Sequence, residues 1–443
     1  MKEELKDFKV GMAKADVTPE LDCLLYGYPW ERFGKKVRDN LSVGAVAISQ
    51  NGQAILLISA EVCAMDRDLC DIIRKKISEK TNVKWENILC AATHTHSGPV
   101  TRTSVGWGEA NVDYVEQKLI PASIEAACKA VEDMKPAVMG IGITESKAGI
   151  NRREVLPEES PEGKVILGQN PDGPYDPTMT VISFQTREGE NIGSIVHFAA
   201  HPTATQWNFS ITRDWPGVMV DKIEEITGAP CMFINGAEGD VGPRLQNRRT
   251  TADERYVKWL GDVAANDAEE AYRNIVSFEI PKMSVVNDHI SLPYQEAPSL
   301  EELEQQMKEM ESRNELAGTS LAQYAKLKKI KEYYDSGTEF PRDLKIQQTI
   351  IALDNLAMVP LPFEAFCNIA LSLKEKSPYQ STLLLGLTGG SYGYLPTEDQ
   401  LPFGGYEVES FRAAAGIALS FADNTDKIVV EQNVKLLQKM YLG

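Results

Sequence analysis

The sequence predicts a mixed α/β (α+β) fold, with mixed β-sheets covered by helices in one large domain over residues 1–443. Three observations lead to this prediction. The 443 residues are 43% apolar and 25% charged, which is typical of a globular chain with a buried core. Strand-like and helix-like stretches alternate from the N-terminus to about residue 135. No repeat, low-complexity tract or interdomain linker divides the chain.

The first part of the chain carries the clearest local patterns. Asn51-Gly52 separates two apolar stretches, residues 43–49 and 54–59, and this dipeptide between such stretches predicts a β-hairpin. Helical spacing then predicts a helix over residues 66–80 and a long helix over residues 112–134. Between them, a short apolar run predicts a buried strand over residues 87–92.

The middle of the chain contains one irregular segment and a second group of elements. Residues 152–176 are rich in Pro, Gly and Glu, so we expect a surface excursion without regular structure. The sequence here also predicts a hairpin around Gly189, whose strands cover residues 179–185 and 192–200. It then predicts a helix over residues 216–227 and a strand over residues 230–234.

A polar helical hairpin is predicted as an insertion over residues 299–335. The segment is dense in Glu, Lys, Gln and Leu, and Ala317-Gly318-Thr319 interrupts it, which indicates two helices joined by a turn. No strict heptad is sustained, so a coiled coil is not favoured. We expect a cover over the functional site or an oligomer contact. The remaining predicted elements are two strands and a helix, over residues 346–353, 357–359 and 408–419.

Charge and composition exclude several partners. Lys and Arg number 46 against 64 Asp and Glu, so the net charge of −18 repels the phosphates of nucleic acid. No apolar run approaches the roughly 20 residues that a bilayer requires, so no transmembrane segment is expected. The charged N-terminus lacks a signal-peptide pattern, and seven cysteines form no CxxC pair. Together these features favour a cytoplasmic protein with reduced, buried cysteines.

Histidine is scarce, and four of the five histidines fall in two short groups at predicted strand ends. His94 and His96 directly follow the strand over 87–92, where a two-residue period places both imidazoles on one face. Such a pair can supply two metal ligands, or one ligand and a proton shuttle, and the alternative is a hydrogen-bonded pair. His197 and His201 also lie on an apolar strand. We favour His201 as the ligand, because it lies at the break before Pro202, and His197 as structural.

A hydrolytic zinc site needs about three protein ligands and an open position for water, and a carboxylate is the natural remaining ligand. Glu364 is a lone charge among apolar and Pro residues, where burial without a cation or metal would be costly. The alternative is a helix N-terminal Glu after Pro362. The Gly-rich turn after the strand over 230–234 places Asp240 near the same edge, although an ordinary tight turn explains it equally well.

The ordered series of motifs resembles the catalytic domain of the neutral (non-lysosomal) ceramidases, which are zinc-dependent amidases. The resemblance is collinear over most of the chain. The matching segments are Gly11 to Thr18, Thr93-His-Thr-His-Ser-Gly-Pro99, Asn151-Arg152, Phe198-Ala-Ala-His-Pro202, Thr212-Arg-Asp214, Gly239-Asp-Val241, Leu361-Pro-Phe-Glu364, and the tyrosines Tyr394 and Tyr406.

The resemblance implies a role for each matched residue. It implies one zinc ion with four ligands, namely His94, His201, Glu364 and Tyr394. His96 is implied as the general acid/base, while Arg152 and Tyr406 hold the substrate carbonyl or stabilise the oxyanion. Asp240 is expected among the catalytic residues and Asp214 at the substrate.

Two departures from the family pattern shape the expected reaction. The family serine of Gly-Asp-Val-Ser-Pro is Gly242 here, so an acyl-serine at this position is impossible, whereas water activated by the metal could still attack the carbonyl directly. After Tyr406 only a short helical stretch and a tail remain, so no counterpart of the family's C-terminal β-sandwich is expected. We therefore expect hydrolysis of an N-acyl amide that is smaller or more soluble than ceramide.

Two other functions stay open on the sequence alone. A metal-dependent esterase or carbohydrate-directed hydrolase would use aromatic platforms, and Trp107 and Trp207 lie near the two histidine groups, although half-buried packing also explains them. A non-catalytic protein that binds metal or ligand would explain Gly242 but not the retained His96.

Overall fold

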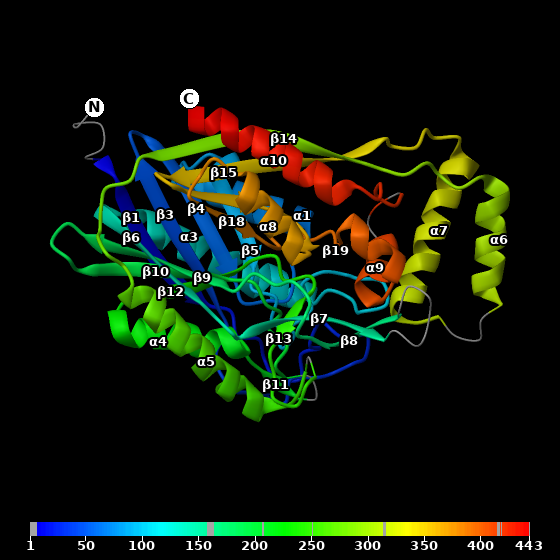
Figure 1. The fold of residues 1–443 in the computed structure, drawn as a ribbon, viewed down its shortest axis with the longest axis horizontal. Helices are drawn as coiled ribbons and strands as arrows, with labels where there is room; N and C mark the ends of the chain where they lie inside the picture. Colours follow the sequence, from blue (N-terminus) through cyan, green and yellow to red (C-terminus); the bar gives the residue numbers. More distant parts are fainter. Residues whose placement is uncertain are drawn as a thin grey trace.

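The computed structural model describes residues 7–156, 164–205, 208–249, 251–312, 316–413, 417 and 419–442. Its fold is the predicted mixture of α and β structure. Figure 1 shows strands gathered in the middle of the molecule, with α4 and α5 on one side, α10 on the other, and the α6–α7 pair at one end.

An eight-stranded sheet forms most of the β structure, in the order β12-β10-β9-β6-β1-β3-β4-β5. Its strands are β1 (Lys9–Asp16), β3 (Ser42–Gln50), β4 (Gln53–Ala60), β5 (Ile88–Ala92), β6 (Lys135–Glu145), β9 (Thr178–Thr186), β10 (Asn191–Phe198) and β12 (Cys231–Asn235). β3 and β4 form the hairpin predicted at Asn51-Gly52, and β9 and β10 form the hairpin predicted around Gly189.

The sheet curls, and β1 and β6 near its middle pair over only two residues. The edge strand β12 thereby returns to β4, where Ser59 Oγ donates a hydrogen bond to the carbonyl of Phe233. A second sheet, in the order β14-β15-β16-β18, closes the remaining side of the curl. Its strands are β14 (Met283–Pro293), β15 (Asp343–Leu353), β16 (Leu356–Pro360) and β18 (Ser381–Leu385).

The four largest hydrophobic clusters comprise one central part and three outer parts, and two smaller clusters lie at the α6–α7 pair and around Tyr26. Alternate side chains explain this division, since a strand sends successive residues to opposite faces. On β3, Val46 and Ile48 enter the central cluster shared with the second sheet, while Val43 and its alternates pack under helices. The covering helices are α1 (Arg67–Thr81), α3 (Ile120–Glu132), α4 (Trp215–Thr227), α5 (Glu254–Arg273), α8 (Cys367–Lys376) and α10 (Thr425–Leu442).

The helix predicted over 112–134 has three parts: α2 (Val112–Tyr114), a π-helical turn η3 (Val115–Leu119), and α3. Pro121 lies at the start of α3, and its missing N–H accounts for the local change of hydrogen-bond pattern. The remaining short elements are β2 (Lys36–Val37), β11 (Ser210–Ile211), η2 (Trp85–Asn87) and η4 (Glu398–Phe403).

The prediction of an irregular segment over 152–176 is wrong in part. β7 (Gly149–Leu156) and β8 (Lys164–Asn170) pair antiparallel, and β7 also pairs with β13 (Val241–Pro243). The strand is hard to recognise because Asn151, Arg152 and Arg153 are buried polar residues, so the apolar alternation of a strand is missing. Residues 157–163 of this segment lie outside the described residues.

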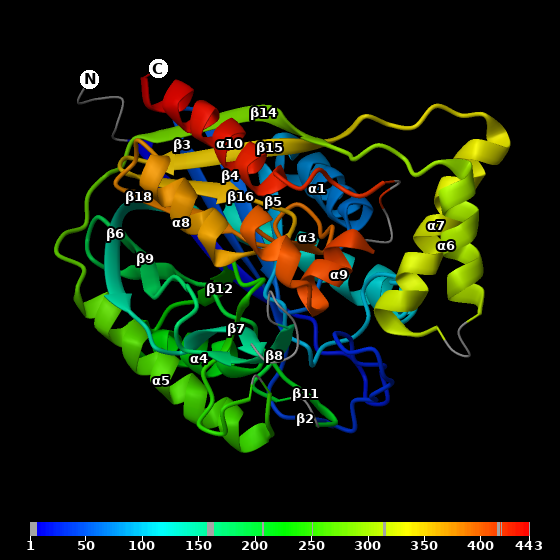
Figure 2. The same ribbon diagram turned by 45° about the vertical axis from the view of Figure 1, so that its right-hand side comes forward.

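The predicted helical hairpin is present as α6 (Leu300–Glu311) and α7 (Gly318–Ser336). Figure 2 shows the pair side by side at one end of the molecule, with α9 (Tyr406–Arg412) between it and the sheets. The Lys326 ammonium on α7 donates hydrogen bonds to the Arg412 carbonyl, at the end of α9, and to Ser420 Oγ. The helix predicted over 408–419 is shorter than expected. It ends at Arg412 with its C-cap at Ala413, and residues 414–416 and 418 of the predicted segment lie outside the described residues.

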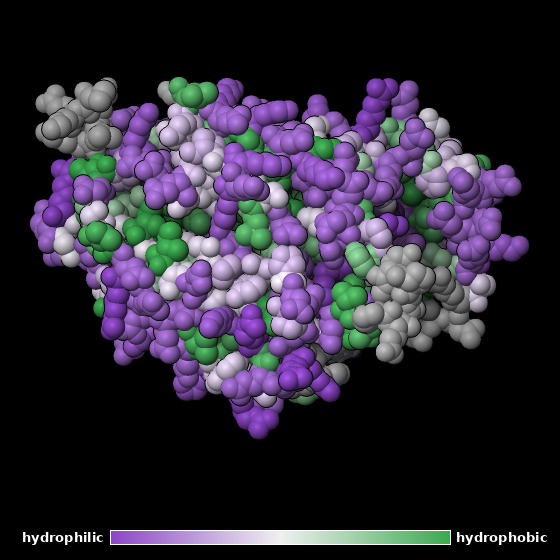
Figure 3. All heavy atoms as spheres, viewed as in Figure 1, coloured by the Kyte–Doolittle hydropathy of each residue, from purple (hydrophilic) through white to green (hydrophobic). Residues whose placement is uncertain are grey.

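Hydrophilic residues cover most of the face drawn in Figure 3, with hydrophobic residues scattered among them. Among the described residues, no helix combines the length and the apolar character needed to cross a bilayer.

Gly142→Ala tests the contact between α5 and β6. An alanine Cβ at this position would lie 1.8 Å from the backbone oxygen of Ala271, so strand and helix must move apart. We expect urea unfolding to show a loss of about 1–3 kcal/mol in the free energy of unfolding. Gly98→Ala is the control, since its Cβ meets no atom closer than 3.5 Å. Equal stability of both variants and the wild type would contradict this packing.

Candidate metal centre

The ends of five strands meet at one place in the structure. His94 follows β5 and His201 follows β10, and Asn235 at the end of β12 joins the two segments. Its Nδ2 donates to the carbonyls of Thr93 (3.3 Å) and Ala200 (3.4 Å). The Gly386 N–H, just after β18, donates to the Asn235 carbonyl. The chain after β16 passes the same point, where a two-stranded sheet of β17 (Glu364–Ala365) and β19 (Tyr394–Leu395) places Glu364 directly beside Tyr394.

Three of the predicted ligands present their donor atoms to a common point. Glu364 Oε2 lies 3.4 Å from His94 Nε2 and 3.3 Å from His201 Nε2. The phenol oxygen of Tyr394, the fourth predicted ligand, lies 3.4 Å from His201 Nε2. Around a tetrahedral ion with bonds of about 2.0–2.1 Å, neighbouring ligand atoms are about 3.3 Å apart. The measured separations fit a zinc-sized ion.

The other nitrogen of each histidine ligand is held by a backbone carbonyl. His94 Nδ1 donates to the carbonyl of Cys63 (2.7 Å), and His201 Nδ1 donates to the carbonyl of Glu238 (2.8 Å). With Nδ1 carrying the proton, Nε2 keeps its lone pair and points to the common centre. Burial lowers the pKa of His201 to about 3, which favours the neutral, ligating form.

Electrostatics also keep Glu364 ionised. Burial opposes ionisation of the carboxyl, but the adjacent His94 and His201 hold the pKa of Glu364 well below its usual range. The backbone at His94 has a φ of 73°, in the left-handed region that non-glycine residues seldom adopt. Backbone strain of this kind is concentrated at functional sites.

A buried ionic network supports Tyr394. Arg152 donates one hydrogen bond to the Tyr394 oxygen (2.8 Å) and another to Glu407 (2.9 Å). Arg153 donates to the second oxygen of Glu407 (2.8 Å), so this carboxylate is paired on both sides. The guanidinium of Arg152 is thereby fixed against the phenol, a position that stabilises negative charge on the phenol oxygen.

His96 lies beside the ligand group without belonging to it. His96 Nε2 lies 3.2 Å from His94 Nε2. The ligand atoms of His94, His201 and Glu364 all lie within 4.8 Å of one another, and His96 is not a member of this group. Its Nδ1 is buried and has no hydrogen-bond partner among the described residues. Burial, followed by the charges of His94 and His201, lowers the pKa of His96 well below its usual value. A neutral imidazole here can accept a proton.

A second group of possible ligands, Cys63, His94 and His96, lies close by. It shares His94 with the first group, but the Cys63 thiol lies near Nδ1 of His94 and not near Nε2, the atom that faces Glu364. The sulfur lies 3.7 Å from His94 Nδ1, which already donates to a carbonyl. The first group is therefore the better candidate for a metal. Sequence reasoning missed Cys63, which belongs to no motif.

The candidate centre opens on a cavity of about 640 Å³. His94, His96, Glu364 and Tyr394 line it, together with Tyr406 and Trp107. Helix α7 of the predicted hairpin forms part of its wall, through Thr319, Ala322, Ala325, Lys326 and Lys329. Trp207, predicted as a stacking platform, lies outside the described residues.

Two predicted site residues, Asp214 and Asp240, lie outside the cavity lining. The Asp214 carboxylate caps α4 and accepts the backbone N–H groups of Ala204, Thr205 and Trp215, because its backbone turns back at a φ of 58°. Asp240 is buried, and its carboxylate accepts from the backbone N–H of Cys367 and from Asn151 Nδ2. Neither residue lines the cavity, and each carboxylate accepts hydrogen bonds from neighbouring backbone N–H groups, so their predicted roles at the substrate and in catalysis stay predictions.

Burial dominates the electrostatics of the carboxyls behind the centre. It raises the pKa of Asp214 and Asp240 to about 6 each. It raises the pKa of Glu238 to about 8, and neither carboxyl oxygen of Glu238 has a hydrogen-bond partner among the described residues. Glu238 lies in the Gly-rich turn between β12 and Asp240. The sequence of such a turn does not indicate that its carboxylate is buried.

Removing a ligand should weaken metal binding. We expect about one zinc ion per chain in the wild type, and a loss of at least ten-fold in zinc affinity in His94→Ala and Glu364→Ala, because each removes a donor from one centre. Elemental analysis after dialysis against buffered zinc measures this. His289→Ala is the matched control, since His289 is exposed on β14. Full zinc occupancy in both ligand variants would refute the assignment.

His197, predicted as structural, should make the fold acid-sensitive. Its Nε2 donates to the carbonyl of Leu384 (2.9 Å), and burial lowers its pKa to about 4. The unfolded chain binds this proton near pH 6.5, so stability is full above that pH and falls as pH drops towards 4. The loss corresponds to about 3 kcal/mol. Urea titrations of wild type and His197→Gln at pH 7 and pH 4 test it, and identical pH dependence in both proteins would contradict the assignment.

Comparisons with known proteins fit this geometry. A family model described as neutral/alkaline non-lysosomal ceramidase, N-terminal, matches residues 8–257. Neutral ceramidase from Pseudomonas aeruginosa is 24% identical over 258 residues, which cover 54% of this chain and 37% of that protein. Neutral ceramidase B from Dictyostelium discoideum is 26% identical over 269 residues, which cover 54% and 36% respectively. The matched parts thus span little more than a third of these relatives.

The fold comparison extends further along the chain. The crystal structure of neutral ceramidase from Pseudomonas aeruginosa superposes with a TM-score of 0.70 at 18% identity, covering 98% of this chain and 75% of that one. The β17–β19 pair and the second sheet, beyond the residues of the family match, therefore belong to the shared fold. The chain is a member of the neutral/alkaline non-lysosomal ceramidase family.

Proposed function

We propose that the chain is a zinc-dependent hydrolase that cleaves the N-acyl amide bond of a substrate smaller or more soluble than ceramide. The observation that carries this proposal is the convergence of His94 Nε2, His201 Nε2 and Glu364 Oε2, with the Tyr394 oxygen beside them, at the end of a cavity. Family membership supports the same reaction class.

Each residue of the site has a task in this reaction. A zinc ion, when bound, supplies Lewis acidity at a carbonyl oxygen and makes water acidic enough to act near neutral pH. His96, neutral and next to His94, accepts the proton of the attacking water and returns it to the leaving nitrogen. Tyr406 lines the cavity and offers a hydroxyl to the substrate oxygen.

Arg152 has a different task from the one first expected. Its guanidinium is engaged by Tyr394 and Glu407 and does not belong to the cavity lining, so we propose that it positions Tyr394 rather than holding the carbonyl. The absence of a serine at Gly242 fits a direct attack by water, because Gly242 carries no nucleophile.

The cavity supports a small substrate. A volume of about 640 Å³ is in the range of sites for drug-sized molecules, and α7 forms part of its wall. Trp107 also lines it, which keeps an ester or carbohydrate-derived substrate as the second candidate. A panel of matched N-acyl, O-acyl and nitrophenyl-glycoside compounds separates the two.

His96→Ala should separate proton transfer from metal binding. We expect zinc content equal to that of the wild type, and a fall in kcat of about 10²–10⁴-fold on the preferred acyl substrate, because the proton acceptor is lost. Elemental analysis and steady-state kinetics measure the two quantities, with His289→Ala as the control.

Two outcomes would contradict the proposal. Turnover by His96→Ala at the wild-type rate would remove His96 from the reaction. Zinc-loaded wild-type protein that cleaves no acyl compound in the panel would favour a protein that only binds metal or ligand.

A further inference from the structure

Four basic residues line the cavity, although the chain as a whole carries a net charge of −18. They are Arg67, Arg102, Lys326 and Lys329. A cationic group in a partly enclosed wall needs a partner, because burying charge without one is costly. The partners of these four residues therefore indicate which charge is left for a ligand.

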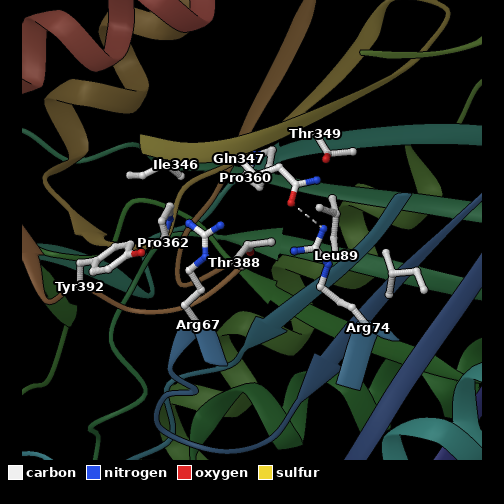
Figure 4. A pocket seen from close by; sticks show the side chains of 12 residues that line it. Arg67, Arg74, Leu89, Ile346, Gln347, Thr349, Pro360, Pro362, Thr388 and Tyr392 are labelled. Carbon is white, nitrogen blue, oxygen red and sulfur yellow. Dashed lines mark hydrogen bonds between the residues drawn. The ribbon is translucent and has the colours of Figure 1, made fainter. Parts of the chain in front are cut away.

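Two of the four are already engaged by the fold. Lys326 donates to the Arg412 carbonyl and to Ser420 Oγ, which attaches α7 to α9. Arg67 pairs with Asp71 at 3.6 Å and donates to the carbonyl of Lys345. Figure 4 shows Arg67 beside Tyr392 on the wall of an adjoining pocket. That pocket has a volume of about 20 Å³, room for about one water molecule, so it is not a ligand site.

Arg102 is different, because its guanidinium is held by neutral groups alone. Its Nε donates to the Tyr26 hydroxyl (3.2 Å) and its Nη1 donates to the carbonyl of Ser391 (2.7 Å). Among the described residues, no carboxylate pairs with it and Nη2 makes no hydrogen bond. The side chain is thus fixed in place with one donor left over and no described carboxylate in direct contact with its charge.

Two further donors line the same cavity. Ser391, whose carbonyl binds Arg102, is 92% buried, and its hydroxyl has no hydrogen-bond partner within the described part of the chain. Lys329 on α7 forms no ion pair with any described residue. Asp66 and Asp68 also line the cavity, but Asp66 accepts the Leu69 N–H as the cap of α1, and neither pairs with Arg102 or Lys329.

We propose that Arg102, Ser391 and Lys329 form a subsite for an anionic group on the substrate, a carboxylate or a phosphate. This inference rests on the proposed hydrolase function, and it narrows the substrate class to acylated amines that carry a negative charge. A guanidinium with a free N–H and an ammonium, both in the lining of one cavity, bind such oxygens by charge-assisted hydrogen bonds. Because the acidic surface repels anions at long range, the subsite acts through contact.

Calorimetric titration with matched ligands tests the subsite. The probes are N-hexanoylglycine, its neutral counterpart N-hexanoylglycinamide, and N-hexanoyl-O-phosphoethanolamine, added to the zinc-loaded His96→Ala protein to suppress turnover. We expect at least one anionic probe to bind about ten-fold or more tightly than the neutral amide. Whichever anion shows the preference identifies the group as carboxylate or phosphate.

Variants assign that preference to residues. Arg102→Gln and Lys329→Gln, each in the same background, should reduce the ratio of anionic to neutral affinity towards one. Lys328→Gln is the matched control, because Lys328 is the exposed neighbour on α7 and its ammonium lies over the Tyr324 ring instead of in the cavity. A ratio near one in the parent protein would overturn the proposal, as would a preference that survives in both variants.

Hydrolysis assays distinguish this failure from failure of the proposed function. Equal kcat/KM for the carboxylate and amide substrates would refute the anion subsite and leave the hydrolase standing. Binding preference for an anion without cleavage of any acyl compound would support the subsite and refute the hydrolase.

Discussion

The site depends on two backbone carbonyls that accept hydrogen bonds from histidine Nδ1 atoms. Cys63 holds His94 in this way and Glu238 holds His201, and each bond fixes both the tautomer and the plane of its ring. The Nε2 lone pairs then converge on Glu364. An imidazole free to rotate would pay side-chain entropy on binding an ion, so these bonds prepare the centre in advance.

The curled sheet explains how distant segments reach this centre. Asn235 links the ends of β5 and β10, and the segment after β18 binds the end of β12, so both sheets contribute to one locus. The Glu364–Tyr394 pair follows from the register of two very short strands. Arg152, paired with Glu407 at the base, holds the tyrosine in position.

The histidine motifs at the strand ends could be found from the sequence, because an apolar strand pattern is followed directly by histidine, which is scarce in this chain. His94 and His96 follow one apolar strand and His201 follows another, and the two proposed ligand histidines, His94 and His201, lie at the strand ends where the pattern places them. Tyr394 came only from the resemblance, since a two-residue strand has no periodicity. The motif around Asp214 does not reveal that its carboxylate caps a helix. Arg102 and Ser391 lie in loops whose contact depends on tertiary structure alone.

The most direct test is anomalous X-ray scattering at the zinc edge from crystals of the zinc-loaded protein. We predict one peak about 2.0–2.2 Å from His94 Nε2, His201 Nε2, Glu364 and Tyr394, with His96 outside bonding distance. A peak between Cys63, His94 and His96, or no peak among these side chains, would contradict the account.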